Sequence, residues 1–308
     1  MIISASRRTD IPRFHTPWFL ERVRAGCCVY PSPFDPRRQV RVSLRPEDVD
    51  VIVFWSKDPA PLLSVLPELA ARGYRFYFHF TVNGYLPFLE PAVRPLPEIL
   101  DAFARLADAV SPDRVIWRYD PIVLSDATPP DYHRRQFEGL AARLAGHTRR
   151  VVVSVFDDYR RAGAMLRRAA RRASVRLDLS GPGTPVMDSL LADLAAIARS
   201  TGLDISSCAE LQDLTPLGIR PGKCIDDGFI RGTFGIRVSG RKDPGQRPAC
   251  RCVESRDIGT YGTCRHGCTY CYATGFARGK ARGHEEAGEG AGRVRCADPA
   301  DGVAGSAG

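Results

Sequence analysis

The sequence predicts an α/β protein, a full or partial (β/α) barrel whose cysteine-rich C-terminal segment folds over the carboxyl ends of the strands. Apolar, β-branched and aromatic runs alternate with longer helical patterns. Several of the runs are nearly continuously apolar, as expected for strands of a parallel sheet covered on both faces. A doubly wound open sheet is the alternative, but no glycine-rich phosphate loop follows any run.

Six strand-like runs are each followed by a helical pattern, and this repeat is typical of a parallel barrel. The predicted strands lie at 1–6, 50–59, 74–84, 114–124, 150–159 and 203–210. The predicted helices are Pro17–Ala25, Ala60–Arg72, Leu96–Val110, Asp131–Ala145, Asp158–Ala173 and Pro185–Thr201. Residues 1–210 are therefore expected to form the barrel body.

The composition changes after residue 210. Glycine, proline and charged residues dominate up to residue 262, and only "FGIRVS" (234–239) is typical of a short strand. We expect 211–276 to be a cysteine-rich, cluster-binding segment. Residues 277–308 contain too few large apolar side chains to pack and are expected to be disordered.

The formal net charge of +9 allows nucleic acid as a partner, because basic surfaces bind phosphate. Among the 44 basic residues, however, only Lys57, Lys223, Lys242 and Lys280 are lysines. Such an arginine bias is equally typical of a GC-rich coding sequence, so nucleic acid is not the favoured partner.

The start of the chain has no basic leader followed by an apolar region, and no stretch approaches the roughly 18 apolar residues of a membrane span. We therefore expect a cytoplasmic protein with no membrane partner. In that compartment the ten cysteines favour metal or redox chemistry over a disulfide framework.

Each of the six predicted strands ends in polar side chains, at the end that forms the active-site mouth of a barrel. The candidates for catalysis are His79, Asp120, Cys208 and Glu210, and those for substrate binding are Arg7, Arg8, Asp10, Asn83 and Asp157. Arg7, Arg8, Lys57 and Arg118 would make the pocket suitable for a small anionic substrate carrying a carboxylate or phosphate. The alternative is that these charges pair with one another, as Arg118 could with Asp120.

Cys264, Cys268 and Cys271 have the spacing C-x3-C-x2-C in the stretch "CRHGCTYCYA". Three thiolates in a short loop can hold three irons of a cubane [4Fe–4S] cluster and leave the fourth iron open. Soft ligands leave zinc as the other choice. His266 could be a fourth zinc ligand, but it lies only two residues from two of the cysteines, which is awkward for one tetrahedral site.

The remaining cysteines indicate a second metal site. Cys224, Cys250 and Cys252, together with Cys208, could bind an auxiliary iron–sulfur cluster or a structural zinc ion. C-x-C is a weaker pattern than C-x2-C, and buried incidental thiols are the alternative.

"CRHGCTYCYA" resembles the cluster loop of radical S-adenosylmethionine enzymes, and its fuller form resembles the subset that includes spore photoproduct lyase-like proteins. This resemblance implies a [4Fe–4S] cluster and S-adenosylmethionine as cofactors, a 5′-deoxyadenosyl radical, and an electron donor such as ferredoxin or flavodoxin. It also implies that Tyr270 lies near the adenine. Lys57 and Arg118, from their place at the strand ends, are our candidates for holding the cofactor's carboxylate.

Over residues 1–275 the chain also resembles the bacterial family called domain of unknown function 1848. The landmarks are "SASRRTDIP", "FWSKDP", "VIWRYDPI", "CAE", "GKCID" and "CRCVESRDIGTYGTCRHGCTYCYA". This second resemblance favours the iron–sulfur interpretation and names no substrate.

One departure matters, because the cysteine loop of ordinary radical S-adenosylmethionine enzymes follows the first barrel strand. Here it follows the sixth, and no "GGE" segment follows a strand. The hypothesis therefore requires the C-terminal segment to return to the strand ends, near His79, Arg118 and Cys208. The alternatives are a zinc-dependent barrel hydrolase or lyase with structural C-terminal cysteines, and a metal-stabilised nucleic-acid-binding protein.

Overall fold

The central feature is one parallel sheet whose strands lie in chain order, except that the last strand pairs with the first. The computed structural model describes residues 1–32, 35 and 37–274. The sheet order is β11-β10-β8-β6-β5-β4-β1-β12. Its strands are β1 (Ile2–Ala5), β4 (Val51–Ser56), β5 (Phe76–Thr81), β6 (Val115–Ile122), β8 (Arg150–Val155), β10 (Asp204–Ser207), β11 (Arg220–Pro221) and β12 (Arg256–Asp257). The α/β prediction is confirmed, and all six predicted strands are present. Within the described residues β11 and β12 do not pair, so the barrel is not closed.

The helices agree with the sequence pattern to within two residues at each predicted end. They are α1 (Ile11–Phe14), α2 (Thr16–Ala25), α3 (Leu66–Ala71), α4 (Leu96–Val110), α5 (Pro130–Leu144), α6 (Arg160–Arg172), α7 (Pro185–Ser200) and α8 (Asp227–Phe234). The predicted helix 60–72 is divided into a 3-10 helix, Ala60–Val65, and α3. Further 3-10 turns lie at Pro46–Asp48, Pro112–Arg114 and Thr215–Leu217.

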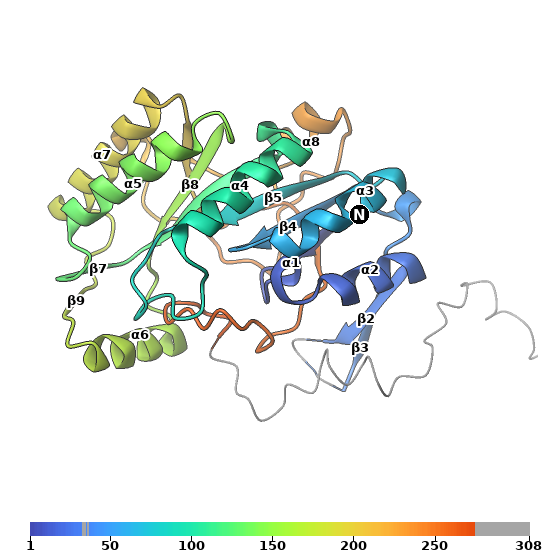
Figure 1. Cartoon of the computed structure of the whole chain (residues 1–308), viewed down its shortest axis with the longest axis horizontal. Coiled ribbons are helices and arrows are strands. Elements are labelled where there is room, and N and C mark those ends of the chain that lie inside the picture. The colour runs from blue at the N-terminus through green and yellow to red at the C-terminus, as the bar shows by residue number, and fades with distance from the viewer. Residues whose placement is uncertain (33–34, 36, 275–308) are drawn as a thin grey trace, which may run out of the picture.

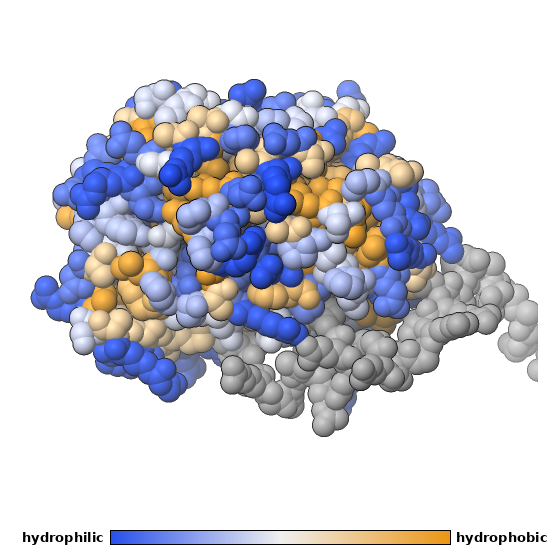
Figure 2. Space-filling model, in the orientation of Figure 1, coloured by the Kyte–Doolittle hydropathy of each residue, from blue (hydrophilic) through white to orange (hydrophobic). Residues whose placement is uncertain are grey.

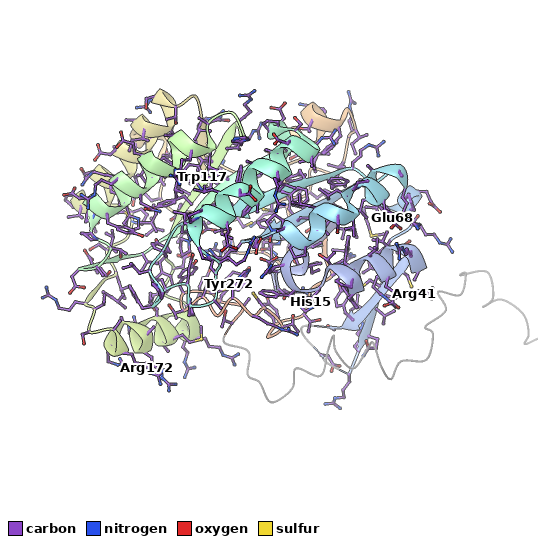
Figure 3. All side chains as sticks on the ribbon, in the orientation of Figure 1. His15, Arg41, Glu68, Trp117, Arg172 and Tyr272 are labelled. Atoms are coloured by element: carbon purple, nitrogen blue, oxygen red, sulfur yellow. The ribbon has the colours of Figure 1, made fainter. Side chains whose placement is uncertain are left out.

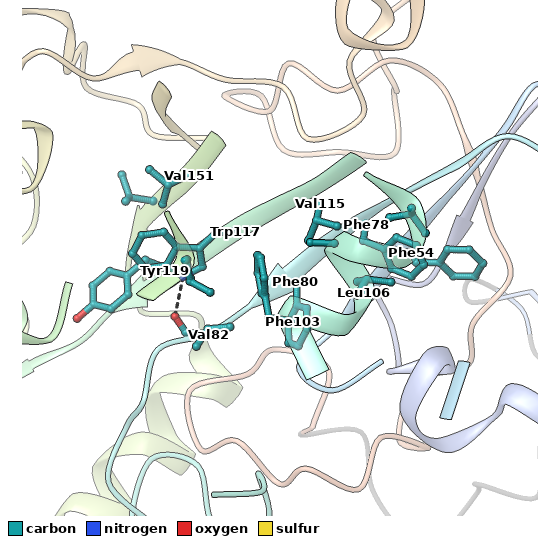
Figure 4. Close-up of a cluster of buried hydrophobic side chains, with 14 of the residues drawn as sticks. Phe54, Phe78, Phe80, Val82, Phe103, Leu106, Val115, Trp117, Tyr119 and Val151 are labelled. Carbon is teal, nitrogen blue, oxygen red and sulfur yellow. Dashed lines mark hydrogen bonds between the residues drawn. The ribbon is translucent and has the colours of Figure 1, made fainter. Parts of the chain in front are cut away.

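The outer face of the sheet is covered by helices. Successive strand residues point to opposite faces, and Phe54, Phe80 and Trp117 belong to the buried cluster that packs against α2, α3, α4, α5 and α7 (Figure 4). The Trp117 indole nitrogen donates to the carbonyl of Val82 at 2.9 Å. Figure 2 shows hydrophilic side chains interspersed with hydrophobic ones over the surface of this helical layer.

The inner face is covered by the C-terminal segment. Val53, Tyr77 and Ile116 form a second buried cluster with residues that follow β11, namely Ile225, Phe229, Ile230, Cys250, Cys252 and Val253. The segment then reaches the opposite edge of the sheet, where β12 pairs in parallel with β1. Figure 1 shows its last described stretch, in orange-red, running below the sheet on the same side as α6.

Several elements were not predicted. Residues 234–239 form no strand, because Phe234 is the last residue of α8 and Gly235 caps that helix in the left-handed conformation. Two small antiparallel pairs, β2–β3 (Cys27–Pro31 and Gln39–Ser43) and β7–β9 (Leu124–Ser125 and Leu177–Asp178), also appear. The predicted disordered tail, 277–308, lies outside the described residues. No helix in the described part of the chain could span a bilayer.

The buried His133 should make folding sensitive to acid. Tyr119 Oη donates to Nδ1 at 2.7 Å, and Nε2 donates to the carbonyl of Val123 at 3.1 Å. Burial lowers the pKa of His133 to about 4, whereas a histidine in the unfolded chain titrates near about 6.5. Between these pH values the unfolded chain binds a proton at this histidine and the folded chain does not. The free energy of unfolding therefore decreases as the pH falls, and His133 contributes at most on the order of 3 kcal/mol to the decrease.

Urea unfolding measured across this pH range tests the prediction. His133→Gln should weaken the loss of stability on acidification, and His147→Gln, at a half-buried histidine, is the matched control. The comparison between variants is needed because burial raises the pKa of Glu210 to about 7, which contributes with the opposite sign in the same range. An unchanged slope in the His133 variant would show that this histidine is not held neutral.

Candidate functional site

The cysteine loop, residues 264–272, lies at the carboxyl ends of β1, β4 and β5. His266 Nε2 donates to Asp10 Oδ2 at 2.9 Å, and the same carboxylate accepts from the Lys57 backbone N–H at 2.8 Å. The Thr269 backbone N–H donates to the carbonyl of Leu89 at 3.0 Å. The Tyr272 hydroxyl, labelled in Figure 3, donates to the carbonyl of Arg7 at 2.7 Å. The strand ends therefore hold the loop at several points.

Local geometry requires glycine at two positions in or near this loop. Gly267 has a φ of +68°, which a residue with a side chain adopts only with strain. It makes the turn between Cys264 and Cys268. A Cβ at Gly259 would lie 2.0 Å from Ser6 Oγ, so only glycine allows β12 to approach the end of β1 this closely.

The three thiols of the loop are free, and they lie near enough to one another for their charges to interact. Cys268 is buried, and the charges of Cys264 and Cys271 both act on it. Burial raises the pKa of the Cys264 thiol to about 12 and that of Cys268 well above its usual range. Buried thiols are therefore protonated until a metal displaces the protons.

The donor set of the cysteine loop suits a soft metal. Three thiolates are soft ligands for iron or zinc. In the described part of the chain, no group of three or more His, Cys, Asp or Glu side chains is already arranged to hold a metal ion. A cubane cluster binds each thiolate to a different iron, whereas a single zinc ion binds all of its ligands.

Unsatisfied polar atoms surround the same loop. Within the described residues, His266 Nδ1, Thr9 Oγ1 and Thr260 Oγ1 are buried and have no hydrogen-bond partner. Buried polar atoms normally have a partner, and leaving one without costs roughly 1–3 kcal/mol. Such orphaned atoms beside three free thiols fit a polar group bound at this position.

Lys57 lies at the centre of a buried polar network beside the loop. Its ammonium group is 2.7 Å from Glu90 Oε1 and 5.6 Å from the centre of the Tyr270 ring. Glu90 also accepts from Tyr270 Oη and from Asn83 Nδ2, the latter at 3.1 Å. Burial alone would lower the Lys57 pKa, but the charges of Glu90 and Cys268 outweigh it, so the pKa is raised. Lys57 thus remains a cation next to Cys268.

Asn83 links this network to Arg118 and Asp120. Its Nδ2 donates to the carbonyl of Asp120 at 3.0 Å. The Arg118 guanidinium pairs with the Asp120 carboxylate, which also accepts from Ser154 Oγ. Burial would raise the pKa of Asp120, but Arg118 and these hydrogen bonds lower it.

An aromatic stack lies beside Arg118. The ring of His79 stacks on Trp55, with 4.4 Å between the centroids, and Arg118 lies 5.4 Å from the centre of the Trp55 ring. His79 Nε2 donates to the carbonyl of Cys224 at 2.7 Å, while its buried Nδ1 has no partner within the described residues. Burial and the nearby Arg118 charge lower the His79 pKa to about 3. His79 therefore offers a neutral acceptor.

A second group of thiols adjoins Arg118. Cys224 Sγ lies 2.8 Å from Arg118 Nη1 and 3.3 Å from Cys208 Sγ. Cys252 is hydrogen-bonded to both Cys224 and Cys250. We call Cys208, Cys224, Cys250 and Cys252 the four-thiol group. It is connected to the cysteine loop through Arg118, Asp120, Asn83 and Lys57, so the polar strand ends lie between two sets of free thiols.

The remaining predicted site residues have structural partners. Arg7 donates to Ser255 Oγ at 2.8 Å, and Arg8 donates to the carbonyls of Asp257 and Gly259. Asp10 accepts from four groups, among them Ser56 Oγ and His266. Asp157 pairs with Arg247 at the surface, and Glu210 accepts from the Val155 backbone N–H at 2.9 Å.

Two important residues were not predicted from the sequence. Glu90 lies in a loop after β5, in a stretch that carries no recognisable motif. Asp257, in β12, accepts from Ser4, Ser6 and the Arg7 backbone, and so fixes β1 to the C-terminal segment. His266 was considered as an awkward zinc ligand, whereas its Nε2 anchors the loop to Asp10.

These features define an α/β protein with a singly wound parallel sheet and a three-thiol loop at its carboxyl edge. The chain belongs to the family described as domain of unknown function (DUF1848), whose model matches residues 2–273. Among curated proteins no match was found. Among solved structures, a tetrameric deoxyribose phosphate aldolase from Aeropyrum pernix is similar, with 14% identity, 66% of this chain and 76% of that chain covered, and a TM-score of 0.28.

Proposed function

We propose that this protein is a radical S-adenosylmethionine-like iron–sulfur enzyme acting on a small, anionic substrate. The observation that carries the proposal is the contact of the cysteine loop with the ends of β1, β4 and β5. Catalytic groups of parallel barrels gather at this edge. The fold-back of residues 211–274 over these strand ends compensates for the late position of the cysteines, because a site depends on placement in space and not on chain order.

Cys264, Cys268 and Cys271 would hold a [4Fe–4S] cluster. Such a cluster would pass one electron, received from a donor such as ferredoxin or flavodoxin, to S-adenosylmethionine, whose C5′–S bond would then break to give methionine and a 5′-deoxyadenosyl radical. Lys57 and Arg118 are the buried cations available to hold the carboxylate of S-adenosylmethionine. Tyr270 is held rigid by Glu90 and Asn83 and offers an aromatic face beside Cys268.

The other strand-end residues would orient and enclose the substrate. His79 presents a neutral, buried Nδ1 acceptor. Asp120 carries a negative charge that Arg118 balances. Arg118 is itself shared between Asp120 and Cys224, so an anionic substrate would have to compete with these partners. This competition favours a substrate with more than one polar group over a simple monoanion.

Metal analysis of anaerobically purified protein tests the cofactor. We expect iron and sulfide in equal amounts, together with a broad visible absorbance band that bleaches on reduction. Cys264→Ser/Cys268→Ser/Cys271→Ser should lose this band, while Cys28→Ser, at a free buried cysteine in β2, should keep it. Colourless protein that carries only zinc would contradict the proposal and favour a zinc-dependent hydrolase or lyase.

A further inference from the structure

The four-thiol group brings together sulfur atoms from three separate segments. Cys208 directly follows β10, Cys224 follows β11, and Cys250 and Cys252 come after α8. The sulfurs are in contact in the order Cys208, Cys224, Cys252, Cys250. All four thiols are free; three are buried and Cys208 is half-buried.

Backbone hydrogen bonds fix the segments that carry these thiols. The Cys208 backbone N–H donates to the carbonyl of Val153 at 2.9 Å, which continues the pairing of β10 with β8. The Val253 backbone N–H donates to the carbonyl of Ile225 at 3.0 Å, so the C-x-C stretch is paired with the stretch that carries Cys224. Paired backbone segments, and not side-chain rotation alone, therefore bring the four sulfurs together.

The surroundings of the sulfurs suit thiolates. Arg118 Nη1 lies 2.8 Å from Cys224 Sγ, and the Ile225 backbone N–H donates to Cys252 Sγ at 3.4 Å. Arg7, in addition, lies near enough to Cys252 for their charges to interact. Metal-bound thiolates are stabilised by such N–H donors and cations in the surrounding shell. Thiols that only fill space in a core need neither N–H donors nor nearby cations.

We propose that Cys208, Cys224, Cys250 and Cys252 bind a single thiophilic metal ion, Zn²⁺ by preference, at a site separate from the cysteine loop. A Zn–S bond of about 2.3 Å gives a tetrahedral sulfur–sulfur edge of about 3.8 Å. The Cys208–Cys224 contact of 3.3 Å is close to that edge. In the described residues, no three of these side chains surround one point. Metal binding would therefore turn the four sulfurs from a row into a tetrahedron. It would also release the thiol protons to solvent, because thiolates are the ligands.

Such an ion would fasten the C-terminal segment to the sheet. Between β11 and β12 the segment has only one helix, α8, among the described elements, yet it covers the inner face and carries the cysteine loop. A metal linked to β10, to the chain after β11 and to the C-x-C stretch would hold this segment in place. The inference does not rest on the proposed function, because it concerns other cysteines.

The test uses the full chain with the first site removed. Cys264→Ser/Cys268→Ser/Cys271→Ser is stripped of metal and titrated with Co²⁺, whose absorbance reports tetrahedral thiolate ligation. We expect equimolar binding, displacement by Zn²⁺, and an affinity lower by more than about 100-fold once Cys224→Ser and Cys252→Ser are added. Cys28→Ser in the same background is the control and should bind Co²⁺ unchanged.

Alkylation of Cys208 in the first-site variant, mapped by mass spectrometry, gives a second readout if the variant with five substitutions does not fold. Zn²⁺ should slow this reaction strongly. Folded first-site variant that binds no Co²⁺, or Cys208 alkylation unaffected by Zn²⁺, would overturn the proposal. Iron with sulfide at these cysteines would overturn the single-ion assignment. Because the first site is absent throughout, failure here leaves the proposed enzyme function standing, and success does not support it.

Discussion

If the cysteine loop binds the cluster as we propose, replacing Cys268 with serine should abolish S-adenosylmethionine cleavage and remove iron and sulfide from the protein. Cys268 is the buried member of the three thiols, and its neighbour Lys57 provides the adjacent positive charge. Serine is close to cysteine in size but is a poor ligand for iron, so the fold should survive while the cluster is lost. The measurement is anaerobic product analysis beside circular dichroism and iron determination.

Cys28→Ser is the matched control for this substitution, because Cys28 is also buried and free but lies in the β2–β3 pair. It should leave iron content and product formation unchanged. Full activity in Cys268→Ser would contradict the assignment of this loop as the cluster site. Equal loss in both variants would point to a general effect of removing a buried thiol.

Glu90→Gln should destabilise the protein by about 3–5 kcal/mol, because it leaves the Lys57 ammonium buried without a counter-charge. The side chains of Lys57 and Glu90 are only 13% and 4% exposed. Lys57→Met together with Glu90→Gln should recover much of the loss, since no unpaired charge then remains. Urea unfolding of the wild type, the two single variants and the double variant forms the complete cycle.

The same substitution at Glu68 is the control. Glu68 pairs with Arg24 and Arg72 at the surface, where water replaces a lost ion pair. Glu68→Gln should therefore change stability far less than Glu90→Gln. Similar effects at the two positions would show that Lys57 finds another partner, and the polar network described here would need revision.

The fold was largely predictable because its signals are local. Helix α4 was predicted to the residue, since its apolar positions repeat at helical spacing between Pro95 and Ser111. The six main strands are runs of apolar residues bounded by polar ones. Helix α8 was missed because glycines interrupt its pattern, although Asp226 caps its start and Gly235 its end. Strand β12 has only two residues, which is too short for a sequence pattern, and it forms by pairing with the edge strand β1.

The candidate site was predictable only in part, because some of its residues are placed by the sheet and others only by tertiary contacts. The sheet sets the positions of Lys57, which directly follows β4, and of Asp120, which lies near the carboxyl end of β6. Glu90 lies in a loop whose path depends on tertiary contacts, so nothing in the sequence connects it to Lys57. No sequence pattern connects Asp10 with His266, because these two hydrogen-bonded residues are far apart in the chain. The cysteines were recognisable because few other side chains suit soft metals.

The most direct test of the proposed function is the fate of S-adenosylmethionine. Protein reconstituted anaerobically with iron and sulfide should, on addition of dithionite, convert S-adenosylmethionine to 5′-deoxyadenosine and methionine. The variant with Cys264, Cys268 and Cys271 all replaced by serine should form neither product. If the reconstituted protein carries a complete cluster and still leaves S-adenosylmethionine intact, the central claim is wrong.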